Sequence, residues 1–438
     1  MSLSDKKITI IGGGILGLST AYFLAKKGAD VTVLEKNSDW GGLASGIPIA
    51  DTTIEKYYHH WFRSDTEIQE LIKELGLAEK LRWIPSKVGL YYKGKIYGFS
   101  TGLDLLKFPH LSIFDRLRSG VVTFFLQKIK SYKRFDKISA IDWCRKYFGK
   151  RATSVIWEPL LRGKFGDAYD KVAMTWLWAR IHDRSSSRSN PLANEKLGYL
   201  DGGFQLFIDT LVDKLRELNV KFISKAEITD HSYKNKKHKI DYRVKGSKNN
   251  TPSEITSDKI IATVPGPVFT KLFDVSAETR KRINSMKYLG ATTLLLVLKK
   301  SMMPYYWLNV NDLSFPFLVM VEHTNFVDKR FYNDQIILYI AKYIDPEKPL
   351  FNKSKKELID EYEGYLRKIN PEFSKEWIKE SFLFKSAFAQ HIVTTDYRRP
   401  EYQTDIPGLY LANFSQIHPH DRGTNYSVAQ ARELLKLI

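Results

Sequence analysis

The stretch KITIIGGGILG, residues 7–17, decides the fold of this chain. Its β-branched first half predicts a buried strand at 7–11, and apolar residues at helical spacing follow at 18–27. A second apolar run at 31–34 ends in Glu35. Strand, glycine turn, helix and second strand together take about 30 residues, the length that a parallel crossover requires. The sequence therefore predicts a Rossmann-like α/β domain.

The glycines of this turn have separate roles in gripping a diphosphate. Gly12 permits the tight turn, Gly14 lets the backbone approach a pyrophosphate, and Gly17 lets the helix pack closely on the strand. The helix N-terminus offers free N–H groups and the positive end of its dipole. Glu35 stands where a carboxylate can accept hydrogen bonds from both ribose hydroxyls. We therefore predict a dinucleotide site, with a purely structural glycine turn as the alternative.

Two further segments favour FAD over NAD. Shortly after Glu35, the pair Gly41-Gly42 predicts a second close approach of backbone to the same cofactor. Near the end of the chain, the segment 408–413 is followed by a turn at 422–426 and a final helix. The N-terminus of that helix could set its dipole against the flavin pyrimidine ring and stabilise negative charge on the reduced flavin. An ordinary helix cap is the alternative interpretation of this turn.

Charge and cysteine content bound the class of protein. The 438 residues carry 68 Lys and Arg against 49 Asp and Glu, a net charge of +19, which favours anionic partners. The basic residues are scattered and form no known reader motif, so nucleic acid is not expected. The single Cys144 excludes an intrachain disulfide, suits a reducing compartment and is expected to be a buried structural thiol. With no signal peptide and no apolar run near the roughly 20 residues of a membrane span, we expect a cytoplasmic protein, at most peripheral on the inner face of the membrane.

On these motifs the chain resembles the flavin-containing amine oxidase superfamily, nearest its protoporphyrinogen oxidase and phytoene desaturase branch. The similarity covers most of the chain and includes Gly202-Gly203 and the strand 261–265. It implies an extended FAD with Ile228 near the adenine. One departure matters: the superfamily usually has Glu or Asp after Ala-Gly where this chain has Ala412-Asn413-Phe414. Asn413 either replaces the missing acid at the ribityl hydroxyls, or that contact is lost.

The predicted cofactor contacts are collected from the glycine turn, the Gly41-Gly42 segment, the middle strands and the C-terminal turn. They are Gly12, Gly14, Ile15, Leu16, Gly17, Glu35, Lys36, Gly41, Gly42, Leu43, Ala44, Ile228, Val264, Asn413, Gly423, Thr424, Asn425 and Tyr426.

The resemblance also implies two interleaved domains. The middle region, 60–200, is expected to be mostly helical, and strands of a second sheet are expected at 292–299 and 336–343. We assign residues 1–60, 200–275 and 385–438 to an FAD-binding domain, and residues 61–199 and 276–384 to a substrate domain of helices over the second sheet. The predicted fold class is α/β, with an α+β substrate domain.

A histidine-rich segment is the first candidate on the substrate side. Residues 55–65, EKYYHHWFRSD, are similar to the histidine-bearing segment of UDP-galactopyranose mutases, and matching the two places His60 against the flavin. There His60 could donate to the flavin ring and titrate near neutrality. The alternative is that His60 is a packing group in an aromatic core, an interpretation that fits the neighbouring His59 still better.

A second candidate segment is WEPLLRGKFGD, residues 157–167, which is similar to a pocket-lining segment of protoporphyrinogen oxidases. Gly163 and Gly166 would hold a turn open, so that Arg162 or Lys164 reaches an anionic group. His60, Arg162 and Lys164 are therefore the predicted catalytic residues, and no metal site is expected.

Two basic stretches remain open to alternative interpretations. Residues 113–130 place an apolar helical face beside basic residues, so they could lie on an anionic membrane or cover the core of the substrate domain. Residues 180–188 are predicted to form a polar, serine-rich loop, which could bind phosphate or only water.

The leading functional hypothesis is an FAD-dependent oxidoreductase that takes a hydride onto flavin N5 from a hydrophobic or anionic-amphiphilic small molecule. Cationic groups would anchor a carboxylate or phosphate of that substrate. The alternative is a non-redox sugar-nucleotide mutase that uses reduced flavin, similar to UDP-galactopyranose mutase. A third hypothesis is a membrane-surface protein that holds FAD without turnover. The sequence identifies neither the substrate, the electron acceptor nor the oligomeric state.

Overall fold

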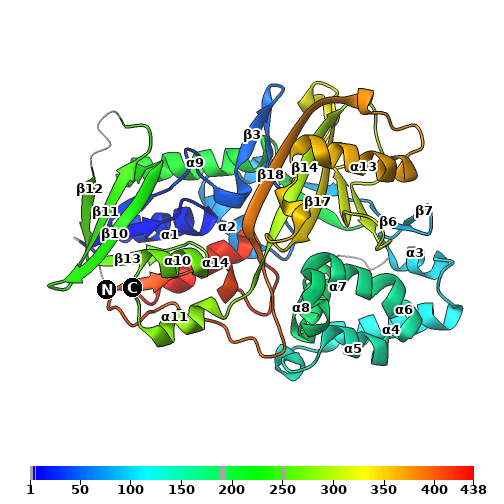
Figure 1. The fold of residues 1–438 in the computed structure, drawn as a ribbon, viewed down its shortest axis with the longest axis horizontal. Helices are drawn as coiled ribbons and strands as arrows, with labels where there is room; N and C mark the ends of the chain where they lie inside the picture. The colour runs from blue at the N-terminus through cyan, green and yellow to red at the C-terminus, as the bar shows by residue number, and fades with distance from the viewer. Residues whose placement is uncertain (1–2, 5, 188–193, 248–251) are drawn as a thin grey trace.

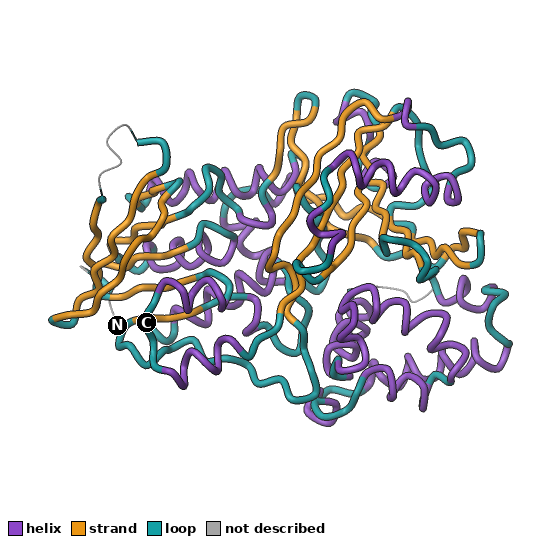
Figure 2. Tube along the Cα trace, in the orientation of Figure 1, coloured by secondary structure: helices purple, strands orange, loops and turns teal. Residues whose placement is uncertain are grey.

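Two large sheets organise the fold that a computed structural model gives for residues 3–4, 6–187, 194–247 and 252–438. The sheets stand side by side, and a helical unit lies beside the second one (Figure 1). Figure 2 shows that helices predominate in that unit, whereas strands run through the rest of the molecule. Segments from the start, middle and end of the chain meet in the first sheet.

The first sheet has five parallel strands in the order β19-β13-β1-β2-β9. Successive side chains of a strand point to opposite faces, so Ile8 and Ile10 pack with one group of helices while Ile11 faces the other side. This arrangement confirms the predicted Rossmann-like domain. The strands are β1 (Lys7–Ile11), β2 (Asp30–Leu34), β9 (Lys221–Ile223), β13 (Lys259–Ala262) and β19 (Leu409–Leu411).

Both faces of this sheet are covered, as a parallel sheet requires. One face packs on α1 (Ile15–Ala25), α9 (Gly203–Glu217) and α14 (Thr424–Leu435). The other faces α10 (Gly266–Leu272) and an antiparallel three-stranded sheet. That small sheet consists of β10 (Ala226–Lys234), β11 (Lys237–Val244) and β12 (Ser253–Ser257).

The second sheet has seven strands in the order β18-β14-β17-β16-β15-β6-β7. Helix α13 (Lys355–Ile369) packs on one face, where Leu358 and Leu366 meet Leu294 and Leu296. The strands are β6 (Val88–Tyr92), β7 (Lys95–Gly98), β14 (Tyr288–Leu298), β15 (Trp307–Val310), β16 (Val319–Glu322), β17 (Ile336–Ile344) and β18 (Ile378–His391).

The helical unit has its own core, in which Phe165, Trp176 and Cys144 are buried. Burial raises the pKa of the Cys144 thiol, which agrees with the predicted structural role. The helices are α3 (Gly102–Lys107), α4 (Ile113–Lys128), α5 (Ala140–Tyr147), α6 (Lys150–Ala152), α7 (Glu158–Phe165) and α8 (Met174–Ser186). The remaining elements used below are α2 (Thr66–Glu74), β3 (Gly46–Ile49), β4 (Thr52–Glu55), β5 (Leu81–Pro85) and β8 (Lys196–Leu200).

The region 60–200 is mostly helical, as expected, but it also contains strands: β5 pairs antiparallel with β8, and β6 and β7 extend the second sheet, because short alternating apolar runs suit a half-buried strand. Two other sequence predictions need correction. The predicted polar loop at 180–188 is the C-terminal part of α8 as far as Ser186, since it continues a helix whose apolar face is buried; Arg188 lies outside the described residues. Gly163 lies inside α7 rather than in a turn.

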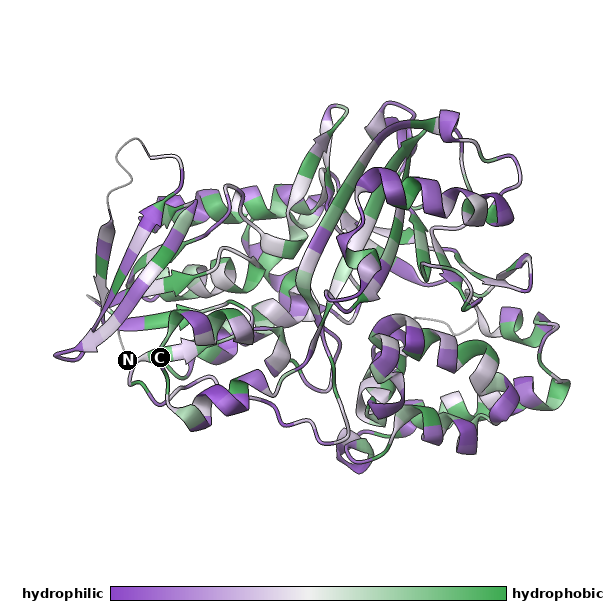
Figure 3. Ribbon diagram, viewed as in Figure 1, coloured by the Kyte–Doolittle hydropathy of each residue, from purple (hydrophilic) through white to green (hydrophobic). Residues whose placement is uncertain are grey.

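The proposed domain division stays a proposal, and β18 runs across its boundary at residue 385. Among the described helices, none combines the length and the apolar character needed to cross a membrane. Figure 3 shows hydrophobic residues concentrated in the two sheets and their covering helices, and also along α4 at the margin of the molecule.

Candidate active site

The two glycine segments predicted to hold the cofactor pack backbone against backbone. Gly41 N–H donates to Gly13 O at 2.7 Å. A Cβ atom added to Gly42 would lie 3.1 Å from Gly14 Cα, closer than most real Cβ contacts. The chain therefore brings two bare stretches of backbone to one place, at the N-terminus of α1, where no side chain caps the helix.

The glycines of the turn differ in what a side chain would meet. At Gly17 an added Cβ would clash with the Gly12 carbonyl, and at Gly12, whose φ is +110°, it would clash with the Thr263 hydroxyl. At Gly14 the nearest atom would be 4.0 Å away. Gly12 and Gly17 thus keep strand and helix together, whereas Gly14 faces open space. A pyrophosphate fits this cradle, because its oxygens would meet backbone N–H groups and the helix dipole there.

Glu35 lies buried at the end of β2, next to the glycine turn. Its carboxylate accepts the N–H of Gly13 at 2.7 Å and the N–H of Asn37 at 2.8 Å. A carboxylate has about four acceptor positions, so two remain for ribose hydroxyls. The prediction for Glu35 is compatible with this geometry. The neighbouring Lys36 is exposed.

Two other predicted cofactor contacts, Ile228 and Asn413, have partners near the ends of the first sheet's strands. Ile228, on β10, packs in the cluster that contains Leu34. Asn413 is buried, and its amide donates to Val264 O at 2.9 Å while its carbonyl accepts the N–H of Ser415. Asn413 therefore ties the end of β13 to the turn after β19. Its contact with a ribityl chain stays a prediction.

Side chains in the first turn of α14 fix its N-terminus by hydrogen bonds to two neighbouring segments, the region of Trp61 and Ile68 and helix α8. Thr424 accepts the indole N–H of Trp61 at 2.8 Å, and Asn425 accepts the N–H of Ile68 at 3.1 Å. Tyr426 donates to Asp183 of α8 at 3.0 Å. No side chain caps the helix at Gly423. The dipole end of α14 is thus fixed in place at the wall of a cleft.

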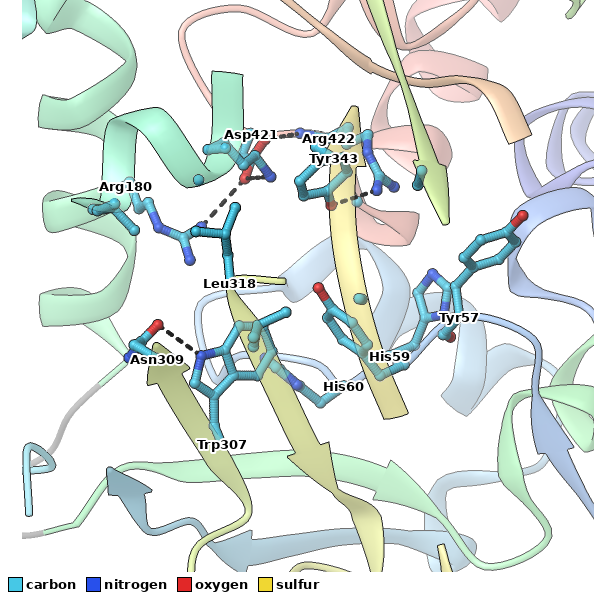
Figure 4. Close-up of a pocket in the computed structure, with 18 of the residues that line it drawn as sticks. Tyr57, His59, His60, Arg180, Trp307, Asn309, Leu318, Tyr343, Asp421 and Arg422 are labelled. Atoms are coloured by element: carbon cyan, nitrogen blue, oxygen red, sulfur yellow. Dashed lines mark hydrogen bonds and ion pairs between the residues drawn. The ribbon is translucent and has the colours of Figure 1, made fainter. Parts of the chain in front are cut away.

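That cleft lies between the second sheet, the helical unit and the start of α14. One wall is the segment after β4 together with the start of α14; a second wall is α7 and α8; a third is β14 to β17. Figure 4 shows its side chains converging from these elements. Its main lining residues are Tyr57, Tyr58, His59, His60, Pro159, Leu160, Lys164, Arg180, Asp183, Arg184, Trp307, Asn309, Leu318, Val319, Tyr343, Asp421, Arg422, Thr424 and Tyr426.

His60 lines the cleft, and its place against the flavin stays a prediction, but its predicted titration near neutrality needs correction. Its Nδ1 lies 2.9 Å from the Tyr306 hydroxyl oxygen, at hydrogen-bond distance. Burial, and then the charge of Arg184, lower the pKa of His60 to about 3. Burial likewise lowers the pKa of His59 to about 4. Both imidazoles are therefore neutral at physiological pH, and His60 serves as a fixed polar group.

Lys164 and Arg162, both predicted to reach an anionic group from an open turn, have different surroundings. Lys164 Nζ lies 2.8 Å from Asp421 inside the cleft. Arg162 bonds to Glu158 and to the Tyr169 hydroxyl, and it is not among the residues that line the cleft. The backbone explains the split: because Gly163 belongs to α7, side chains two positions apart leave the helix on different faces. The geometry gives no support to a role for Arg162 in holding an anion.

An ion cluster not predicted from the sequence surrounds Asp421. Asp421 pairs with both Lys164 and Arg180, the latter at 3.2 Å. Burial opposes the charge of Asp421, but Lys164 and Arg180 outweigh that effect and hold its pKa far below the usual range. Spacing along the chain could not reveal this cluster, because α7, α8 and the C-terminal loop contribute one partner each.

Tyr343 is a further residue that sequence reasoning missed. Arg422 Nη2 donates to its hydroxyl at 2.8 Å, and Lys164 Nζ lies 4.7 Å from its ring centre (Figure 4). Burial alone would raise the pKa of Tyr343, but Arg422 and Lys164 outweigh burial and lower it. The cleft thus holds a tyrosine whose phenol pKa is lower than that of an ordinary tyrosine.

The comparisons with known proteins agree with this site. A family model described as flavin containing amine oxidoreductase matches residues 16–418. The chain belongs to this family. The family's cofactor is FAD, and the glycine cradle, the free acceptors of Glu35 and the uncapped α14 are the parts of this chain that fit it.

Within the flavin-containing amine oxidoreductases, the chain is similar to two oxidases that act on porphyrinogens by name. It is 25% identical over 302 residues to coproporphyrinogen III oxidase of Staphylococcus aureus, covering 61% of this chain and 62% of the relative. It is 25% identical over 254 residues to mitochondrial protoporphyrinogen oxidase of Nicotiana tabacum, covering 51% and 50%. The match thus spans less than two thirds of either relative's length. The predicted similarity to the protoporphyrinogen oxidase branch is confirmed.

A solved structure shows the same fold over the whole chain. It is an Exiguobacterium protein provisionally named a protoporphyrinogen oxidase, with a TM-score of 0.76 and 17% sequence identity. The alignment covers 99% of each chain. The likeness confirms the α/β fold with its interleaved second sheet.

Proposed function

We propose that this protein is an FAD-dependent oxidoreductase that takes a hydride onto flavin N5 from an amphiphilic substrate with an anionic group. The family membership and the oxidase relatives support the oxidoreductase class. When bound, FAD supplies the hydride acceptor. The cleft supports the substrate class, because it joins an apolar wall to a group of buried cations.

The observation that carries the substrate class is an excess of positive charge in the cleft, together with two guanidinium N–H groups that have no partner in the described part of the chain, although Arg184 also pairs with Glu195 through Nη2. Lysine and arginine side chains that line the cleft outnumber acidic ones by five to three. Arg184 and Arg422 each have a buried Nε without a hydrogen-bond partner among the described residues. Buried polar groups are almost always paired, so an anionic ligand is the natural partner for these donors.

The residues of the chain would position the substrate rather than carry the chemistry. Arg184, with Arg180 beside it on α8, would bind a carboxylate or phosphate, and Trp307 and Leu318 would contact the apolar part. Neutral His60 would hold a polar atom without competing for a proton. Tyr343, whose phenol pKa Arg422 and Lys164 lower, would lie beside the substrate and would accept a hydrogen bond from Arg422. A porphyrinogen, which combines an apolar ring system with carboxylates, is one substrate that fits.

Anaerobic reduction of the bound flavin tests this proposal. We expect coproporphyrinogen III or another carboxylated amphiphile to bleach the flavin, and we expect Arg184→Gln to raise the substrate concentration for half-maximal rate by about tenfold, the usual loss for one charged hydrogen bond. The exposed Arg145→Gln serves as the control and should behave as the wild type. Failure of porphyrinogens, isoprenoids, amines and polyprenyl compounds alike to reduce the flavin would contradict the proposal.

The mutase alternative stays an untested prediction, and the reported relatives give it no support. The two activities differ in one measurement. A mutase would turn over a sugar nucleotide only after dithionite reduction and would leave the flavin reduced, whereas the proposed enzyme would start from oxidised flavin.

A further inference from the structure

Helix α4 exposes a large apolar face. Six of its side chains are between 55% and 72% exposed, and two leucines of the adjoining α3 are exposed as well. These eight are among the 14 large hydrophobic side chains that the described part of the chain exposes. They are Leu103, Leu106, Ile113, Phe114, Leu117, Val121, Phe124 and Phe125. We call them the α3–α4 face.

The exposed residues of α4 lie on one side of the helix. At about 100° per residue they fall within an arc of about 120°. Ser119 and Leu126, on the opposite side, are buried, and α4 packs there against the helical unit, including α8. The helix is therefore seated on the core by its other side. Of the two roles open for residues 113–130, covering the core does not account for these exposed aromatic side chains.

Positive charge borders the α3–α4 face. Residues 103–137 contain eight Lys and Arg against three Asp. Six of these cations are exposed, and none of the six forms a salt bridge with a residue that the structure describes. They are Lys107, Lys128, Lys130, Lys133, Arg134 and Lys137. Such a border repels a second copy of the same surface and attracts an anionic one.

We propose that the α3–α4 face docks on an anionic phospholipid bilayer. Amphipathic helices with aromatic and leucine side chains on one face and lysines beside it lie in the interface plane, with the apolar side chains among the upper acyl chains and the cations at the phosphates. The inference goes beyond the proposed oxidoreductase function. The α3–α4 face also lies near the proposed active site, because α4 packs on α8, and α8 carries Arg180 and Arg184 into the cleft.

Co-sedimentation with vesicles tests the proposal without any substrate. We expect the FAD-loaded wild type to bind vesicles of phosphatidylcholine with phosphatidylserine, and we expect Phe124→Ser/Phe125→Ser to lower the partition coefficient at least about tenfold. The matched control is Leu313→Ser/Phe331→Ser, which removes two apolar side chains of similar exposure elsewhere and should leave binding unchanged. Retained FAD shows that each variant is folded.

The dependence of vesicle binding on charge distinguishes the contribution of the bordering cations from that of the apolar α3–α4 face. Lys130→Glu/Lys133→Glu should weaken binding to the anionic vesicles, as should added salt, and pure phosphatidylcholine should bind less. Equal binding by the α4 variant and the control variant would overturn the proposal. The proposal would also be overturned if the wild type did not bind vesicles but formed a dimer that dissociates on dilution. If Phe124→Ser/Phe125→Ser abolished that dimer, the α3–α4 face would be assigned to contact with a second copy of the chain.

Discussion

Gly14 and Gly17 lie in one turn, yet the surroundings of the two residues predict opposite outcomes for the same substitution. An added Cβ at Gly17 would clash with the Gly12 carbonyl, whereas at Gly14 its nearest neighbour would be Gly42 Cα at 4.0 Å, an ordinary contact. The spacing of the glycines predicted both residues but could not separate a packing role from a ligand-facing one. That distinction needs the position of Gly12, Gly42 and Thr263 in space.

Gly14→Val is expected to fold and to lose FAD. The valine would occupy the open space at the start of α1, where the pyrophosphate is proposed to lie, and we expect FAD affinity to fall at least about a hundredfold with a small change in stability. Gly17→Val, by contrast, should fail to fold. The measurement is FAD titration together with circular dichroism. A folded Gly14→Val protein with normal FAD content would contradict the proposed cradle.

A second single residue, Glu55, is expected to make the stability of the protein depend on pH. Burial raises the pKa of its carboxyl to about 7, against the N–H of Phe204 and the hydroxyl of Tyr199, which lower it. Because the unfolded carboxyl ionises near its ordinary value of 4.5, the stabilisation is complete below that pH and is lost as pH rises toward 7. Glu55→Gln should remove on the order of 3 kcal/mol of this decline.

Urea unfolding at pH 5 and pH 8 checks the Glu55 prediction. The wild type should lose more stability than Glu55→Gln between the two pH values. Parallel behaviour of the two proteins would show that Glu55 is already ionised in the folded state at pH 5.

At the scale of elements, the parts of the fold that depend on contacts between residues close in sequence could be predicted, whereas the parts that depend on long-range contacts could not. The unit of residues 7–35 and the strands β14 and β17 follow from local patterns, and the structure has them almost where they were expected. β18 was missed because its pattern mixes charged and aromatic residues along an edge strand. The cluster around Asp421 was missed because its partners are brought together only by tertiary structure.

Asp421 joins three elements, and its removal should loosen them. Asp421→Asn leaves Lys164 and Arg180 without their buried counter-charge, so we expect the free energy of unfolding to fall by about 3 kcal/mol. Asp201→Asn breaks an exposed pair with Arg82 and should cost less than about 1 kcal/mol. Chemical unfolding of both variants measures the difference, and equal values would show that the Asp421 cluster is not a structural joint.

At the scale of the whole molecule, segments from the two ends of the chain complete the first sheet and the helices that cover it. β19 is an edge strand of the sheet that β1 organises, and α14 packs against α1 and α2. Truncation after residue 420 should therefore abolish both folding and FAD binding, although it leaves β1 and the glycine turn intact. Truncation after residue 436, which removes only the exposed Leu437 and the partly buried Ile438, is the control. Soluble, FAD-containing protein from the shorter chain would contradict this account.

The most direct test of the central claim is the visible absorbance spectrum of the purified protein before and after addition of FAD. The account predicts the band of oxidised flavin at about one FAD per chain, retained through gel filtration and lost in Gly14→Val. A folded protein that stays colourless after reconstitution would contradict it.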